Sequence, residues 1–217
     1  MLRINLIGPL FILILWLASP TLAQTSQAFS TAKSFPEPPD TASFEFSSGG
    51  YQYRVSGNGK GHRSGNNKRS FSLRVAPNDY LTRELYYAEY EGDLLLIAEV
   101  SNGDYGMGFI ARLDGATLRM KWKRVIPGFN VGQGLLDGAF AYVTGIGFVG
   151  KVNLKSGAYA WWHTDLYGQA NSGFNIFALP EVEGNVVIFR EVKHYLRKKQ
   201  AVLRVARQSG KIISIIT

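Results

Sequence analysis

A repeat of 46 residues constrains the fold of this chain more strongly than any single motif does. Gly92, Gly138 and Gly184 follow one another at that spacing, and each sits in a polar turn before an apolar run. A second series agrees with the first, because the sequence GFNV at residues 128–131 returns as GFNI at residues 173–176. Each copy of this tetrapeptide stands about ten residues ahead of a turn glycine. The chain therefore consists of stacked units of similar build.

Short apolar runs rich in β-branched and aromatic residues predict strands from Phe44 onward. The clearest runs are Leu94–Val100, Ala139–Thr144, Val186–Val192 and Lys211–Ile216. Clusters of Gly, Asn, Asp and Ser separate the runs, and no apolar pattern of helical period continues for ten residues. The sequence therefore predicts an all-β protein.

Three positions recur at intervals of four residues near the end of each unit. They hold Asp114, Leu118 and Trp122 in the first unit, Asn153, Gly157 and Trp161 in the second, and Ala206, Gly210 and Ser214 in the third. This pattern, over about residues 85–217, resembles the quinoprotein-type β-propeller family, whose PQQ-like repeat has Asp, Gly and Trp at these positions. No unit is complete, so the resemblance is to a degenerate, short and non-catalytic member. It implies a structural role for Trp122, Trp161, Gly157 and Gly210, because the tryptophan of this family packs one blade against the next.

Repeat and resemblance together predict a small β-propeller-like array of three to four antiparallel four-stranded blades over residues 44–217. The length leaves two alternatives open, a small irregular propeller that closes and an incomplete, open arc of blades. An open arc has blade edges that can pair with another chain, which predicts a homo-oligomer. The last strand, Ile212–Ile216, is the element expected to close the array or to pair in trans.

The N-terminus has the features of a signal peptide. Arg3 precedes an apolar run over Leu6–Ala18, and small residues lead to a cleavage site after Ala23. The run is shorter than the about 20 residues of a membrane-spanning helix, although an uncleaved anchor stays open as the alternative. We therefore predict a signal peptide over residues 1–23 and a periplasmic or secreted protein. Residues 24–43 are polar and contain three prolines, which predicts a flexible linker.

The residue types present exclude several kinds of chemistry. The chain has no cysteine, which excludes disulfides, thiolate metal sites and a cysteine nucleophile. His62, His163 and His194 are far apart, no cluster of His, Asp and Glu has the spacing of metal ligands, and no serine stands in a nucleophile elbow. We therefore expect no catalytic residues, no metal and no cofactor, and the sequence does not predict an enzyme.

The formal net charge of +8 favours an anionic partner. Export argues against nucleic acid and leaves an acidic protein or an anionic glycan or lipid of the envelope. Strand order predicts one binding face, because connections between second and third strands emerge on the same side as crossovers between blades. The predicted partner-binding residues are Lys60, Arg63, Lys68, Arg69, Asn102, Asp104, Tyr105, Phe129, Asn130, Gln169, Asn171, Phe174, Asn175, Lys193, Tyr195, Arg197, Lys198 and Lys199. The basic stretches Gly57–Arg69 and Lys193–Lys199 dominate this face, with a flexible loop and a solvated hairpin tip as their alternative interpretations.

These features favour an exported, non-catalytic binding protein of the cell envelope that uses one loop face of a propeller-like scaffold. A periplasmic immunity or inhibitor protein against a toxic envelope enzyme is the first alternative. A remnant of a quinone-dependent dehydrogenase is the second, and it should have a central pocket with convergent acidic groups. The lining of any central pocket therefore helps to distinguish these hypotheses.

Overall fold

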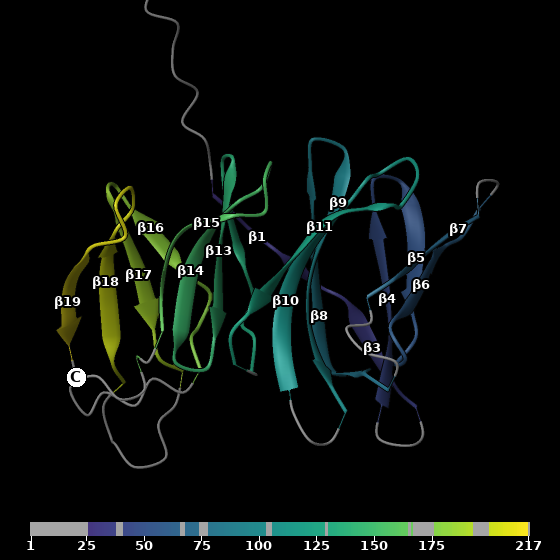
Figure 1. Ribbon diagram of the computed structural model, residues 1–217, viewed down its shortest axis with the longest axis horizontal. Helices are drawn as coiled ribbons and strands as arrows, with labels where there is room; N and C mark the ends of the chain where they lie inside the picture. The colour runs from purple at the N-terminus through teal and green to yellow at the C-terminus, as the bar shows by residue number, and fades with distance from the viewer. Residues whose placement is uncertain are drawn as a thin grey trace, which may run out of the picture.

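The computed structural model describes residues 26–37, 41–65, 68–73, 78–102, 106–128, 130–164, 166, 176–192 and 200–216. These residues form strands, turns and irregular segments, arranged in four antiparallel sheets that follow one another across the molecule (Figure 1). The prediction of an all-β, propeller-like array of four-stranded blades is confirmed. The predicted signal peptide lies outside these ranges, and within them no helix is long and apolar enough to cross a membrane.

We number the sheets as blades in chain order, from right to left in Figure 1. Blade 1 contains β4 (Thr41–Ser48), β5 (Tyr51–Val55), β6 (Lys60–Arg63) and β7 (Arg69–Ser72), and blade 2 contains β8 (Tyr80–Tyr90), β9 (Asp93–Ser101), β10 (Gly106–Leu113) and β11 (Met120–Ile126). Blade 3 contains β12 (Leu135–Asp137), β13 (Phe140–Gly145), β14 (Phe148–Asn153) and β15 (Tyr159–His163), and blade 4 contains β16 (Glu181–Glu183), β17 (Val186–Arg190), β18 (Val202–Ala206) and β19 (Ile212–Ile216).

Each repeat glycine closes the hairpin between the first and second strands of a blade. Gly92, Gly138 and Gly184 have φ angles of +75°, +62° and +57°, in the left-handed region that glycine adopts without steric cost. Consecutive strands then pair antiparallel, and a bulge interrupts the pairing of third and fourth strands in blades 2, 3 and 4. The spacing of the glycines is thus the spacing of the blades.

Three apolar cores lie between successive blades, because each strand turns alternate side chains to the two faces of its sheet. The buried rings of Phe44, Phe148 and Phe189 each belong to a different core. Blade 2 has a neighbour on both faces, and every residue of β9 except the last is buried. Stacking of blade on blade therefore supplies most of the apolar burial in this fold.

The chain enters the array through a segment that we call the N-terminal strap, residues 27–37. Its strands are β1 (Gln27–Ala28), β2 (Ser30–Thr31) and β3 (Lys33–Glu37), and they pair with the first strands of blades 3, 2 and 1 respectively. Between the strands, the N–H groups of Phe29 and Ala32 donate to the carbonyls of Gly134 and Leu85, both at 2.9 Å. The prediction of a flexible linker over residues 24–43 is therefore wrong for the strap, because backbone pairing at a sheet edge does not require an apolar composition.

Candidate functional site

Tryptophans dock blade 2 on blade 3 and blade 3 on blade 4. Nε1 of Trp122, on β11, donates to the carbonyl oxygen of Leu154 in blade 3 at 3.0 Å. A Cβ atom added at Gly157 would lie 2.6 Å from the Trp122 ring, and Trp161 covers Gly210 of blade 4 in the same way. A larger residue does not fit under either ring without a shift. This is the packing role that the resemblance implies for these residues.

A cation stands at the same register position on the third strand of every blade. Arg63, Arg112 and Lys151 each donate to a backbone carbonyl of the next blade, namely that of Gly115 at 2.7 Å, Leu154 at 2.9 Å and Arg207 at 2.9 Å. The fourth member, Arg204, forms an ion pair with Glu183 of its own blade at 3.7 Å. On the fourth strands, the residues opposite these four cations are Arg69, Trp122, Trp161 and Ser214. The first three cations therefore hold neighbouring blades together.

The prediction that Arg63 is a partner-binding residue is therefore wrong. Its side chain is 2% exposed and donates to the carbonyls of Gly115 and Ala116, so it has a structural role. The expected Gly57–Arg69 loop is interrupted by β6, which places its basic residues at different ends of a hairpin. Lys60 begins β6, whereas Arg69 begins β7 and lies opposite Arg63. This strand could not be recognised from the sequence, because the residues Lys60–Arg63 have the polar composition of a loop.

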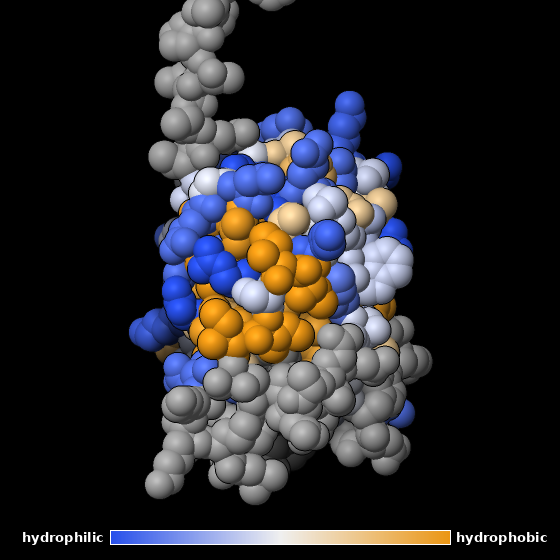
Figure 2. All heavy atoms as spheres, turned by 90° about the vertical axis from the view of Figure 1, so that its left-hand side faces the viewer, coloured by the Kyte–Doolittle hydropathy of each residue, from blue (hydrophilic) through white to orange (hydrophobic). Residues whose placement is uncertain are grey.

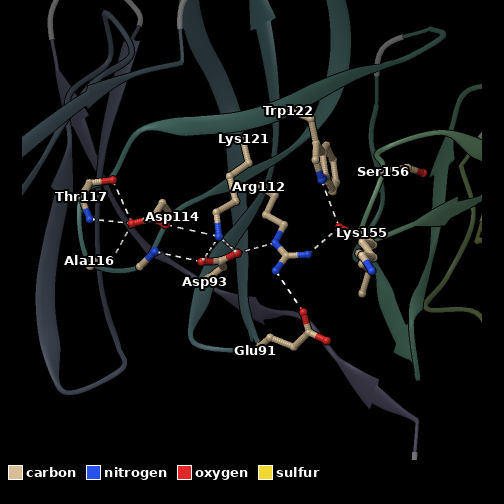
Figure 3. Close-up of polar contacts among 12 residues, drawn as sticks. Glu91, Asp93, Arg112, Asp114, Ala116, Thr117, Lys121, Trp122, Lys155 and Ser156 are labelled. Atoms are coloured by element: carbon tan, nitrogen blue, oxygen red, sulfur yellow. Dashed lines mark hydrogen bonds and ion pairs between the residues drawn. The ribbon is translucent and has the colours of Figure 1, made fainter.

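At the end of blade 2 where the β8–β9 and β10–β11 turns lie, away from the crossovers, a buried carboxylate links the two turns (Figure 3). Asp93 accepts hydrogen bonds from Nε of Arg112 at 2.5 Å, from Nζ of Lys121 at 2.7 Å and from the N–H of Gly115 at 3.1 Å. Arg112 also forms an ion pair with Glu91 at 3.2 Å. Arg112 and Lys121 are thus engaged in holding the turns of blade 2 and the neighbouring blade.

The charges of this network fix the ionisation of its carboxylates. Burial alone would raise the pKa of Asp93, but hydrogen bonds from Lys121, Arg112 and the Gly115 N–H outweigh it and hold that pKa below its ordinary value. The backbone N–H and hydroxyl of Thr117, together with Lys121, lower the pKa of Asp114 to about 2. Both carboxylates are therefore ionised at neutral pH.

A cleft of about 360 Å³ lies at the crossover end of the array. It is lined by residues of β8 and β9, by the crossover segment 130–133, by residues 176–179 and by Val192. Val131, Ile176 and Leu179 give the cleft apolar walls. Blade 2, the segment after β17 of blade 4 and two crossovers thus converge on one concave site, which we call the crossover cleft.

Two glutamates line the crossover cleft, and both already have hydrogen-bond partners. Glu99 is buried and accepts a hydrogen bond from the N–H of Asn130 at 2.5 Å. The hydroxyl of Tyr86 donates to Glu84. Asn130 has a φ of +55°, so a left-handed turn aims its N–H at Glu99. The chain itself therefore satisfies part of the acidic lining.

The structure brings few of the predicted partner-binding residues to this cleft. Asn130 lines it, Asn102 directly follows β9, and Lys60, Lys68 and Arg69 are exposed in blade 1. Outside the described residues lie Asp104, Tyr105, Phe129, Gln169, Asn171, Phe174, Asn175, Lys193, Tyr195, Arg197, Lys198 and Lys199. Glu84, Tyr86 and Glu99 were not predicted. Glu99 could have been recognised as a site residue from the sequence, because it is the one charged residue inside the apolar run Leu94–Val100.

The acidic lining does not fit a calcium ion, which is the metal that the resemblance implies for catalytic members of the family. Calcium takes six to eight oxygen ligands, whereas the cleft offers two carboxylates that are already hydrogen-bonded. Among the described residues, no group of three or more His, Asp or Glu side chains is placed to hold a metal. We therefore derive no reaction step through a metal or cofactor.

Stacked antiparallel blades of this kind define a β-propeller-like protein. No protein-family model matches the sequence, and no curated protein is similar to it. Similar solved structures include the quinohemoprotein alcohol dehydrogenase of Comamonas testosteroni, with a TM-score of 0.51 and 11% identity over 89% of this chain and 37% of that chain. The quinohemoprotein alcohol dehydrogenase ADHIIG of Pseudomonas putida HK5 has a TM-score of 0.50 and 11% identity over 87% of this chain and 36% of that chain.

BamB from Moraxella catarrhalis is a further similar structure, with a TM-score of 0.48 and 12% identity over 87% of this chain and 51% of that chain. This chain thus spans about half of BamB and little more than a third of the dehydrogenases. At these identities the likeness to the dehydrogenases shows the fold alone.

Proposed function

We propose that this protein is an exported, non-catalytic binding module of the cell envelope, and that an acidic protein binds at the crossover cleft. The observation that carries the proposal is the cleft itself, a concave site with apolar walls at the end where the crossovers emerge. Several apolar side chains converge there from separate elements, which is the kind of surface that accepts an apolar segment of a partner.

The basic stretch that follows the cleft in the chain supports an acidic partner over a neutral one, whereas the two glutamates of the cleft are already hydrogen-bonded within the protein. Val192 lines the cleft, and the basic stretch predicted to bind a partner, Lys193–Lys199, begins at the next residue of the chain. At the opposite end, Arg112 and Lys121 already pair with carboxylates of the protein. We therefore propose that the cations of Lys193–Lys199, rather than Arg112 and Lys121, attract the partner.

A pull-down from envelope extract tests the site. Val192 and Val125 are matched for the purpose, because they are 46% and 45% exposed and only Val192 lines the cleft. The purified protein should recover an acidic protein that elutes at moderate salt, Val192→Glu should lose it, and Val125→Glu should retain it. Equal recovery by both variants would refute the cleft as the binding site.

Charge reversal tests the electrostatic part of the proposal. Replacing Arg197, Lys198 and Lys199 by Glu should weaken binding of the recovered protein, with a smaller effect at high salt because ions screen the attraction. The control replaces Ala116 and Lys155 by Glu. Both residues lie in turns at the end away from the crossovers, so this variant should leave binding unchanged. Recovery of a glycan or lipid instead would replace the acidic protein as partner, and recovery of an enzyme that the chain inhibits would establish the inhibitor alternative.

A further inference from the structure

The outer face of blade 4 has an apolar centre. Figure 2 looks at this end of the molecule and shows a group of hydrophobic side chains with hydrophilic ones beside and above it. Val187, Phe189, Leu203 and Val205 belong to the core with blade 3, so strand alternation turns Val186, Val202 and Ile216 to the outer face. Ile213 and Ile216 are 54% and 57% exposed. We call this patch, together with the outer face of strands β16–β19 around it, the blade 4 end face.

The other end of the array has the opposite character. Most outward side chains of blade 1 are exposed and polar, among them Glu45, Gln52, Arg54, His62, Ser70 and Ser72. A terminal repeat with a polar outer face caps a stacked array against further association. Blade 1 is therefore a capped end, whereas the described part of blade 4 leaves apolar side chains in water.

Two features adapt the blade 4 end face to a flat partner. Ser214 occupies the position at which Trp122 and Trp161 project into the following blade, so among the described residues no ring stands out at this position. Ion pairs lie on the same face as the apolar side chains, because Nε of Arg190 lies 2.9 Å from Glu181, and Arg204, opposite Ser214, lies 3.7 Å from Glu183. The face thus carries both signs of charge beside its apolar patch.

We propose that the blade 4 end face binds the same face of a second copy of this chain, related by a twofold axis. An apolar patch is covered best by another apolar patch, and the capped end of blade 1 does not offer one. A face that carries both arginines and glutamates can pair with itself, since the twofold axis repeats both signs on the partner. We expect association to stop at two copies, because the outward side chains described for blade 1 are mostly polar.

The expected dimer is reversible. Four strands about 4.8 Å apart and about five residues long, at about 3.3 Å per residue, give a flat footprint of roughly 300 Å². Interfaces of permanent dimers are larger, and small interfaces of this kind belong to transient associations. The test therefore needs a concentration series rather than a single measurement.

Analytical ultracentrifugation of the purified protein over a wide concentration range tests the proposal. The expected result is a monomer to dimer equilibrium without higher species. Ile213→Glu combined with Ile216→Glu should weaken the dimer at least tenfold, because it places four glutamates in the interface of the two copies. Ser214→Trp should weaken it by a second route, since the ring would separate the two flat faces.

Val125→Glu is the control, because Val125 is comparably exposed on a different blade. Its association should equal that of the unchanged protein, and circular dichroism spectra should show that all variants retain their fold. A protein that stays monomeric at every concentration would overturn the proposal. A dimer that survives both blade 4 variants, or that Val125→Glu weakens equally, would overturn it as well. None of these outcomes depends on binding at the crossover cleft.

Discussion

Leu118 has a backbone conformation that leucine rarely adopts, with a φ of +58°. It occupies the position of Gly157 and Gly210, where glycine lies beneath a docked tryptophan. Blade 1 has Arg69 in place of that tryptophan, and the Leu118 side chain is buried in the core between blades 1 and 2. The leucine thus supplies apolar packing at the interface that has no tryptophan, at the cost of a strained backbone.

At the same interface, Arg63→Met should lower the free energy of unfolding. Methionine keeps much of the apolar stem but removes two hydrogen bonds to backbone carbonyls, which leaves those acceptors with fewer partners. The expected loss is about 1–3 kcal/mol, measured by urea denaturation. Arg54→Met is the control, because Arg54 is exposed and its ion pair with Glu45 spans 3.8 Å. Equal effects of the two changes would contradict the structural role of Arg63.

The buried carboxylate of Asp93 predicts a dependence of stability on pH. Its folded pKa lies below the ordinary value of 3.8, so its stabilising contribution is complete above about pH 4 and is lost as pH falls through the folded pKa. Asp93→Asn should cost about 3 kcal/mol at pH 7, because it removes the buried partner of Arg112 and leaves that guanidinium only the exposed carboxylate of Glu91. The difference between the two proteins should shrink below pH 4. A difference that stays constant from pH 7 to pH 3 would contradict this assignment.

At the scale of elements, the repeat was predictable where side chains carry it. Turn glycines recur at one spacing in blades 2, 3 and 4, and docking tryptophans recur in blades 2 and 3, so these side chains revealed the blades. The N-terminal strap and β6 escaped prediction because their pairing depends on backbone groups. In β6, Gly61 is required because a Cβ there would lie 2.1 Å from the Phe71 ring, yet in the sequence it looks like one more loop glycine. The crossover cleft also could not be predicted, since residues of blade 2, of two crossovers and of the segment after β17 line it.

The N-terminal strap predicts a large effect of a substitution far from any long strand. Phe29 is fully buried in the core between blades 2 and 3, so Phe29→Ala should lower the free energy of unfolding by about 3–5 kcal/mol. Phe35→Ala, in β3, should cost less because that ring is only partly buried. Urea denaturation compares the two variants. A change of less than about 0.5 kcal/mol for Phe29→Ala would mean that the segment is a linker after all.

For the whole molecule, the order of the blades sets a gradient of burial. Blades 2 and 3 each have two neighbours, whereas blades 1 and 4 each have one. Nearly all of β9 is buried, but β19 alternates between partly buried and exposed residues. Stability in stacked arrays depends on the interfaces between neighbouring units, so the inner blades are expected to open less often than the outer ones.

Hydrogen exchange measured by NMR tests this gradient. Amides of Leu95–Ala98 in β9 should exchange at a rate close to that of global unfolding, because opening them requires separation from both neighbouring blades. Amides of Leu203 and Val205 in β18 should exchange faster, since blade 4 is held on one face only. Higher protein concentration should slow exchange in blade 4 if a second copy covers its end face, and should leave β9 unchanged. Equal protection of both strands at low concentration would show that the array unfolds as one unit.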